Sequence, residues 1–180
     1  MSLPRIDGLR SLAALEHPEL VTPQVTAALD SWPHGEDVAV VEIDPALADT
    51  SAMSEAYSLT MDTGANCVVV AGRRAGEERV AACLVRADTR ADVNNLVKRT
   101  LDVRKASFLP IERAVEESGM EYGGITPLGL PAEWRILVDA RVPEMDVAII
   151  GSGVRRSKLL VSGSHLAELP GAEVVEGLAG

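Results

Sequence analysis

The sequence predicts one α+β domain in which strands outnumber helices. The expected strands come as a hairpin, as single segments and as a closing cluster, so they do not alternate regularly with helices as in a doubly wound fold. At 180 residues the chain has the length of a single domain with a substantial core. Because aromatic residues make up only 3% of the chain, this core must consist of Val, Leu, Ile and Ala.

The N-terminal part is predicted to be helical. Ile6–Glu16 carries leucines at helical spacing, and Pro18 ends that segment. Thr22 is the expected N-cap of a second helix and Pro23 its first residue. The apolar face of that helix repeats at i, i+3, i+4 and i+7, at Val25, Ala28, Leu29 and Trp32. We expect residues 1–37 to pack as a helical segment on the remaining domain, residues 38–180.

The middle of the chain contains the hairpin. Its predicted strands are Asn66–Ala71 and Val80–Arg86, separated by the Gly-rich, charged turn Gly72–Glu78. A strand at Val38–Ile43 and a helix over Asp44–Tyr57 precede it, with Thr50 or Ser51 as the helix cap. A helix capped by Asp88 or Thr89 follows it, with Val93, Leu96, Val97 and Leu101 as the buried stripe.

Short elements complete the chain. Val103–Leu109 is extended, and a short helix runs from Pro110 to a Gly119 C-cap. After it we expect strands at Arg135–Asp139, Val147–Ile150, Ser157–Val161 and Glu173–Val175, and a helix over Gly163–Leu169.

The charge is distributed unevenly. The net charge is −10, but residues 1–62 hold eleven acidic and two basic side chains, so the rest is nearly neutral. Twelve of the seventeen Lys and Arg lie in Arg73–Lys105 and Arg155–Lys158. Overall acidity argues against an extensive nucleic-acid interface, whereas these two basic runs could meet phosphates at one end of an RNA, or simply be solvated surface.

Several kinds of site have no support in the sequence. The three histidines are far apart and no HExxH or CxxC occurs, so we expect no metal and no cofactor. There is no Walker loop, no GxSxG elbow and no complete GxGxxG. Cys67 and Cys83 lie in apolar runs and are expected to be reduced thiols, which suits a cytoplasmic protein. No apolar run is long enough for a membrane span, and the N-terminus does not resemble a signal peptide.

The most unusual stretch is Glu121–Pro131, with three glycines and two prolines in eleven residues. Such a run cannot form a helix or a central strand. Gly123, Gly124 and Gly129 permit positive φ and close approach of another molecule to the backbone. The stretch is therefore either a plain connector or a stiff loop whose backbone N–H groups point at a ligand.

This loop resembles a known signature. Gly123 and Pro127 stand at the spacing of the GxxxP motif of the YbaK / prolyl-tRNA editing domain family, and the resemblance extends on both sides through Lys105–Phe108, Leu137–Asp139, Ile149–Gly153 and Ser157–Leu160. It implies a strongly curved, partly barrel-like mixed sheet with helices packed outside. It also implies deacylation of mischarged tRNA, with the acceptor end of aminoacyl-tRNA as substrate and a synthetase as a further partner.

The resemblance also implies the site. The loop Gly123, Gly124, Ile125, Thr126 and Pro127 would hold the aminoacyl-adenosine end and stabilise the oxyanion through backbone N–H donors, with water as nucleophile. Asp139 would line the pocket or merely cap a turn. Gly129 would also bind substrate. The turn Gly151, Ser152 and Gly153 would bind it on the opposite pocket wall, or form only a tight turn.

One position departs from the family. Where the family has a lysine before the hairpin, this chain has Asn66, which offers hydrogen bonds without charge. Lys98, Lys105 or Lys158 could replace the charge in space, or Asn66 could serve only its neighbouring backbone. Because the GxxxP loop is preserved, we expect a trans-acting aminoacyl-tRNA deacylase, whereas Asn66 favours the first of the alternatives. The alternatives are a non-catalytic module that recognises an aminoacyl group, an adenosine or a synthetase, and a hydrolase of another small ester or amide.

Overall fold

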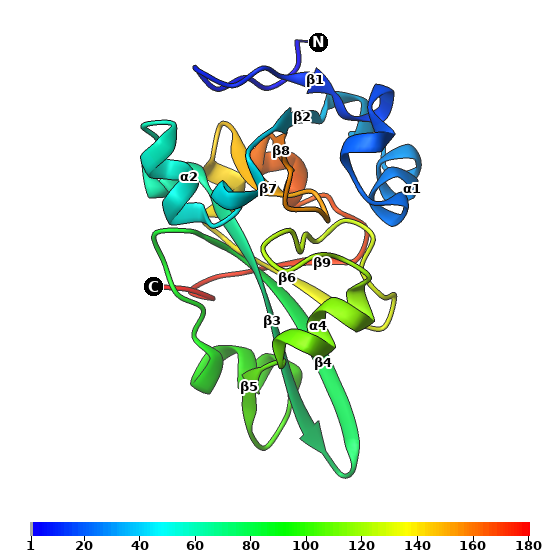
Figure 1. Ribbon diagram of the computed structural model, residues 1–180. Helices are drawn as coiled ribbons and strands as arrows, with labels where there is room; N and C mark the ends of the chain where they lie inside the picture. The colour runs from blue at the N-terminus through cyan, green and yellow to red at the C-terminus, as the bar shows by residue number, and fades with distance from the viewer. Residues whose placement is uncertain (1) are drawn as a thin grey trace.

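The computed structural model describes residues 2–180 and arranges their strands in two sheets (Figure 1). The first sheet has the order β1-β2-β8-β7 and the second β5-β3-β4-β6-β9. The strand bounds are β1 Leu12–Ala13, β2 Ala39–Glu42, β3 Ala65–Arg74, β4 Glu77–Arg86, β5 Ala106–Phe108, β6 Arg135–Asp139, β7 Ala148–Gly151, β8 Ser157–Val161 and β9 Ala172–Val175.

The helices are short. The α-helices are α1 Pro23–Ser31, α2 Thr50–Ala56, α3 Lys98–Leu101, α4 Ile111–Ser118 and α5 Gly163–Leu166. The π-turn η6 covers Val93–Val97, and 3-10 turns cover η1 Ala14–Glu16, η2 Pro18–Leu20, η3 Gly35–Asp37, η4 Pro45–Leu47, η5 Met61–Thr63 and η7 Val142–Glu144. Among residues 2–180, none of these helices has the length and apolarity needed to cross a membrane.

The first sheet is buried on both faces. Its strands pair antiparallel, and neighbouring residues on β8, such as Leu159 and Leu160, point to opposite sides. One side packs against α1 through Val25 and Leu29. The other side packs against Met53 of α2. Continuous apolar runs such as that of β8 arise because neither face meets water.

The second sheet is built on the long β3–β4 hairpin. β6 lies parallel to β4, and β9 lies parallel to β6. The predicted hairpin is confirmed, but its turn is shorter than expected, because Gly72 still pairs with Arg79 and only Ala75 and Gly76 form the connection. Both have positive φ, 51° and 81°, as a two-residue hairpin turn requires.

The predicted helix at Ile6–Glu16 is wrong. Leu12 and Ala13 instead form the edge strand β1, opposite Val40 and Ala39 of β2. Leucine spacing alone could not distinguish a strand from a helix in this segment. In the structure Leu12 and Leu15 contact one core cluster, while Leu9 contacts another on the other side of the sheet. Tertiary pairing of the backbone therefore overrides the local pattern.

Three other helices differ from the prediction. Asp44–Tyr57 is split into η4 and α2, because Asp44 and Asp49 each cap a new turn; the cap of α2 is Asp49 rather than Thr50 or Ser51. The segment after the hairpin is capped by Asp92 rather than Asp88 or Thr89, and it starts as a π-turn. The last helix ends at Leu166 instead of Leu169.

The sheets are open rather than barrel-like. The mixed α+β domain is confirmed, but within residues 2–180 nine strands divide between two sheets, and neither sheet closes on itself or curls strongly. The sheets meet where Gly64, just before β3, forms a parallel bridge with Ile149 of β7. Strands from both sheets therefore lie beside this junction (Figure 1).

Candidate active site

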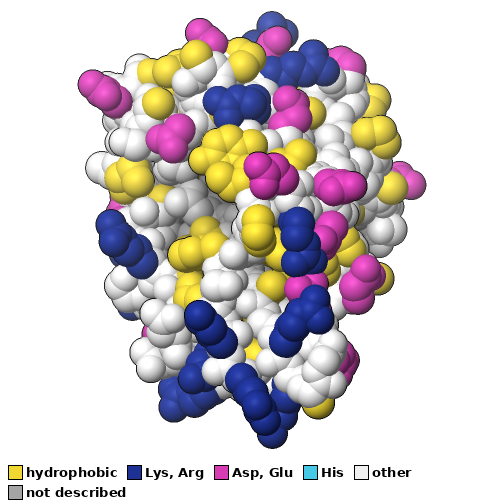
Figure 2. Space-filling model, turned by 60° about the horizontal axis from the view of Figure 1, so that its bottom comes forward, with side chains coloured by type: hydrophobic (Ala, Val, Ile, Leu, Met, Phe, Trp, Pro, Cys, Tyr) yellow, Lys and Arg dark blue, Asp and Glu magenta, His cyan; other side chains and the backbone are white. Residues whose placement is uncertain are grey.

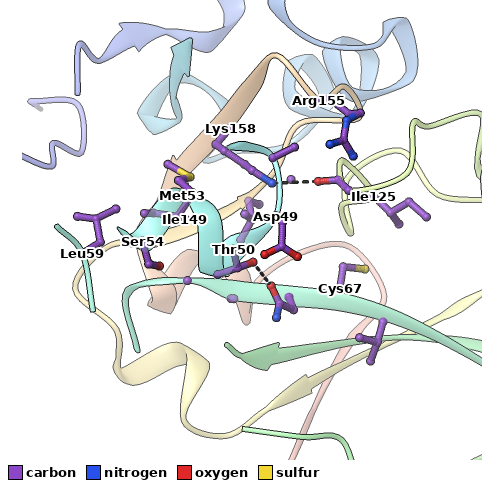
Figure 3. A pocket seen from close by; sticks show the side chains of 18 of the residues that line it. Asp49, Thr50, Met53, Ser54, Leu59, Cys67, Ile125, Ile149, Arg155 and Lys158 are labelled. Carbon is purple, nitrogen blue, oxygen red and sulfur yellow. Dashed lines mark hydrogen bonds between the residues drawn. The ribbon is translucent and has the colours of Figure 1, made fainter. Parts of the chain in front are cut away.

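A cavity of about 370 Å³ lies beside the junction of the two sheets. Its walls are α2 with the turn before it, the start of β3, the glycine loop after α4, and the facing ends of β7 and β8 (Figure 3). The lining residues are Ala48, Asp49, Thr50, Met53, Ser54, Leu59, Thr60, Gly64, Ala65, Asn66, Cys67, Val68, Tyr122, Gly123, Ile125, Ile149, Ile150, Gly151, Arg155 and Lys158. The volume suits a small molecule or one end of a larger one.

The glycine loop is held by its backbone. The Gly153 N–H donates to the Gly124 carbonyl at 2.7 Å, and the Glu121 N–H donates to the Gly153 carbonyl at 2.9 Å. Arg155 donates to the carbonyls of Tyr122 and Pro45 at 2.9 and 3.0 Å, which ties the loop to η4. Gly123 has φ of +82°, which a side chain would strain. The loop is therefore fixed in shape before any ligand arrives.

Lys158 is the buried cation of the cavity. Its Nζ donates to the Gly123 carbonyl at 3.0 Å, and Figure 3 shows it reaching from β8 toward the loop. Its pKa is lowered to about 8, mainly by burial and also by the nearby Arg155, while the Asp49 carboxylate acts in the opposite direction. Lys158 is thus mostly charged at neutral pH but close to its titration midpoint.

The opposite wall is polar. The Thr50 hydroxyl donates to the Asn66 side-chain oxygen at 2.8 Å, which fixes the direction of the amide. The Asn66 NH₂ group has no protein acceptor within residues 2–180, so it can donate to a ligand. Asp49, the N-cap of α2, places its carboxylate in the same space.

The remaining walls are apolar. Met53, Leu59 and Ile149 present hydrocarbon surface toward the cavity (Figure 3). Val68 also lines it. The Cys67 thiol also lies here, and burial together with the neighbouring Cys83 raises its pKa well above the ordinary value. Because a thiol and not a thiolate is present at neutral pH, Cys67 is a poor nucleophile.

The structure brings together only some of the residues expected from the sequence. Asn66, Gly123, Ile125 and Gly151 line the cavity. Gly124 and Gly153 lie directly behind them, joined by the backbone hydrogen bond described above. Pro127 and Gly129 line a separate hollow beside α1, and Thr126 is completely buried.

Two other expected residues point elsewhere. The Asp139 carboxylate is buried and accepts hydrogen bonds from the backbone N–H groups of Arg141 and Ala179 at 3.0 and 2.9 Å, so it anchors the C-terminal segment. The Ser152 hydroxyl is also buried and donates to the carbonyls of Val154 and Ser157, which shapes the β7–β8 turn. Neither residue lines the cavity.

Sequence reasoning missed Asp49, Thr50 and Arg155 as lining residues. Asp49 and Thr50 begin a helix, and the sequence places no chemical motif there. Lys158 is one of the three lysines that could replace the missing family lysine. Its position on an otherwise apolar strand, Ser157–Val161, is the sequence feature that could have singled it out.

The sequence of residues 44–169 matches the aminoacyl-tRNA editing domain family. This chain belongs to that family. The resemblance seen in the GxxxP loop is therefore confirmed over most of the chain. Within this editing domain the matched segment begins immediately before η4 and ends after α5, so it contains every wall of the cavity.

Solved structures share the fold of this editing domain. A hypothetical protein superposes with a TM-score of 0.72 at 20% identity, over 82% of this chain and 94% of its own. A candidate trans-editing enzyme for prolyl tRNA synthetase superposes with a TM-score of 0.72 at 19% identity, over 87% of this chain and 97% of its own. A candidate signal transduction protein from Marinobacter aquaeolei VT8 superposes with a TM-score of 0.56 at 17% identity, over 88% of this chain and 31% of its own. Such identities establish the fold alone.

The shape of the glycine loop can be tested with Gly123→Ala. A side chain at this φ costs roughly 1–2 kcal/mol, and the added methyl would lie 2.8 Å from Arg155 Nη1. We expect cavity ligands to bind at least tenfold more weakly while the protein still folds, as measured by calorimetry and circular dichroism. Gly171→Ala is the matched control, since Gly171 has φ of +77° but open space around it. Full binding by a folded Gly123→Ala protein would exclude the loop from the site.

The lowered pKa of Lys158 can be tested through the pH dependence of stability. Because the pKa of Lys158 is about 8 in the folded protein and near 10.5 when unfolded, the unfolded chain binds more protons between these values. The free energy of unfolding should therefore rise with pH in this window relative to Lys158→Met, as measured by urea denaturation. Lys105→Met, which removes an exposed lysine, should not change that pH dependence. A difference between wild type and Lys158→Met that is constant from pH 7 to 11 would contradict this.

Proposed function

We propose that this protein is a trans-acting aminoacyl-tRNA deacylase whose reaction takes place in the cavity beside Gly123. The observation that carries the proposal is the combination found there: a fixed glycine loop, one buried cation that contacts this loop, and a polar pair opposite. Family membership supports deacylation as the reaction class. The cavity would receive the aminoacyl group, and the open side would admit the terminal adenosine.

The reaction would be ester hydrolysis with water as nucleophile. The water oxygen attacks the ester carbonyl, the C–O bond to the ribose breaks, and the ribose oxygen leaves with a proton. The products are a free amino acid and the tRNA 3′ end. The tRNA ester is activated, and its neighbouring ribose hydroxyl can relay a proton, so the site needs positioning more than a strong base.

Charge on the carbonyl oxygen would be stabilised by the loop. The backbone N–H groups of Gly123 and Ile125 form no hydrogen bond with another residue of the described chain, so they are available as donors. Each such donor contributes about 2.7–4 kcal/mol in characterised hydrolases. We assign to Lys158 the task of holding the Gly123 carbonyl and adding positive potential, and to Asn66 the orientation of the substrate.

The bulk of the tRNA would lie along the β3–β4 hairpin. Asn66 is at the cavity end of β3, and Arg73 and Arg74 are at its other end, about 25 Å away at the usual rise of an extended strand. Arg73, Arg74 and Arg104 surround a hollow at this tip. Figure 2 shows Lys and Arg gathered over the same end of the molecule. Phosphates of an acceptor stem would fit this distance from a 3′ end held in the cavity.

The alternatives are a non-catalytic module that binds an aminoacyl group, an adenosine or a synthetase through the same cavity, and a hydrolase of another small ester. A deacylation screen across mischarged tRNAs with the purified protein separates them. Release of one amino acid above the rate of spontaneous hydrolysis, abolished in Gly123→Ala, supports the proposal. Tight binding of a mischarged tRNA without its hydrolysis would identify the non-catalytic binding module. Hydrolysis of small esters alone would identify the other hydrolase.

The lysine position can be tested with Asn66→Lys. Because Lys158 already places a cation in the cavity, a second one should reduce activity: two cations about 4 Å apart repel by about 1 kcal/mol in water-like surroundings and by more when partly buried. We expect kcat/KM for deacylation to fall at least about fivefold. Asn94→Lys, on the exposed face of η6, is the matched control. Increased activity in Asn66→Lys would show that Lys158 does not supply the required charge.

The RNA surface can be tested by neutralising Arg73, Arg74 and Arg104 to Gln together. Without these cations tRNA should bind more weakly. The slope of log affinity against log salt should become shallower by roughly 0.7–0.9 for each phosphate that is no longer neutralised, as measured by filter binding across salt concentrations. Neutralising Arg5 and Arg10 in the acidic N-terminal part serves as control. An unchanged affinity and salt slope in the triple variant would refute this placement of the tRNA.

A further inference from the structure

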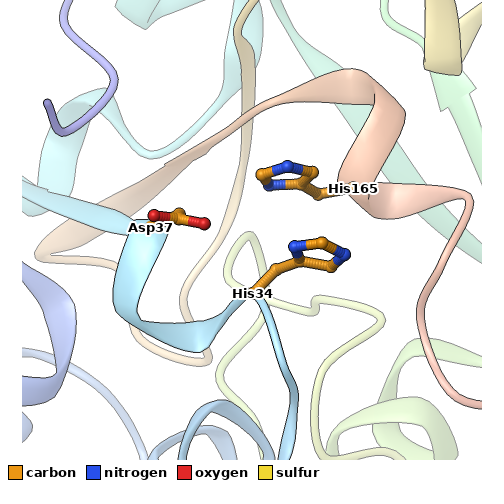
Figure 4. A group of neighbouring side chains, drawn as sticks. All are labelled: His34, Asp37 and His165. Carbon is orange, nitrogen blue, oxygen red and sulfur yellow. The ribbon is translucent and has the colours of Figure 1, made fainter. Parts of the chain in front are cut away.

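Two histidines and an aspartate meet outside the cavity. His34 precedes η3, Asp37 ends η3, and His165 lies in α5 (Figure 4). One nitrogen from each ring and one carboxylate oxygen all lie within 4.8 Å of one another. Figure 4 shows the carboxylate directed toward the two rings. None of the three residues lines the cavity beside Gly123.

The Glu168 carboxylate determines which ring nitrogen of His34 carries the proton. His34 Nε2 lies 3.0 Å from Glu168 Oε2, and this contact places the ring proton on Nε2. In the neutral ring, the other nitrogen, Nδ1, then carries the lone pair. An imidazole held by a carboxylate on its far nitrogen is the arrangement that orients metal-binding histidines in proteins.

His165 supplies a second available nitrogen. Its Nδ1 is buried and has no hydrogen-bond partner within residues 2–180. An unsatisfied buried polar atom is costly, so an atom of this kind calls for a partner that the protein chain does not provide. The Asp37 carboxylate likewise forms no hydrogen bond or ion pair with any described residue.

We propose that His34, Asp37 and His165 bind a divalent transition metal ion of the Zn²⁺ type. Two imidazole nitrogens and one carboxylate oxygen form a donor set that suits such ions, with a fourth position left for water. Zinc ligands of this kind bond at about 2.0–2.2 Å, so their donor atoms must approach one another to about 3.3 Å.

Binding requires a small rearrangement. The two rings are stacked, with centroids 3.9 Å apart and an angle of 12° between their planes, so their in-plane lone pairs lie in nearly parallel planes and do not converge on one point. One ring must turn about its side-chain bonds, and the stack opens. The bound ion would then join the segment after α1 to the C-terminal helix α5, two parts of the chain distant in sequence.

The test uses the untagged protein and Zn²⁺ alone. Zn²⁺ at a hundredfold excess over its Kd should raise Tm by about 5–10 °C, because only the folded chain brings the three ligands together. Competition with a chromophoric chelator gives the affinity and a stoichiometry of one. Co²⁺ should give the intense visible absorption of a four-coordinate site.

The controls follow from the ligand set. His34→Ala and His165→Ala should abolish the Tm shift and the Co²⁺ absorption, whereas His17→Ala should leave both unchanged, since the His17 ring lies against Glu19 and outside this cluster. If His165→Ala fails to fold because its ring packs on Trp32, Asp37→Asn keeps the shape and should still lower Zn²⁺ affinity at least tenfold. No Tm shift in the wild type, or equal Zn²⁺ affinity in His34→Ala, would overturn the proposal.

Discussion

The structure around the cavity depends on close backbone contact between two glycine segments. The Gly153 N–H donates to the Gly124 carbonyl at 2.7 Å, and side chains could not fit between the two segments: a methyl on Gly151 would lie 2.5 Å from the Gly124 carbonyl oxygen, and one on Gly124 2.8 Å from the Val154 backbone. This contact presses the loop after α4 against the β7–β8 turn. It therefore positions Gly123 at the edge of the cavity and directs Ile125 into it.

Two basic side chains that follow the β7–β8 turn, Arg155 and Lys158, also hold the glycine loop in place. Arg155 holds the carbonyl of Tyr122, and Lys158 holds that of Gly123, so the loop carbonyls are occupied by positive charge. A buried lysine with a lowered pKa is unfavourable for folding at neutral pH. Such a group is typical of a functional site, because stability alone would favour an apolar side chain on this strand.

The sequence located the loop better than its partners. Gly123 and Ile125 could be named from the resemblance to the GxxxP motif, because the spacing of that motif is visible in a local stretch of sequence. Lys158 could be named only as one of three lysines, since nothing local shows which of them approaches the loop. Asp49 carried no signal, and Arg155 stood out only as part of the basic run Arg155–Lys158. Each lines the cavity only when α2, the loop and β8 come together.

The sequence by itself determined the mixed α+β class, the bounds of β6 and β8, the hairpin and the family. These depend on periodicity, turn residues and motif spacing, all of which are local. Tertiary structure decided that Leu12 and Ala13 form an edge strand, that the strands divide into two open sheets, and that Asp139 anchors the C-terminal segment. It also brought His34 beside His165. Each of these depends on contacts between residues distant in sequence, which no local pattern encodes.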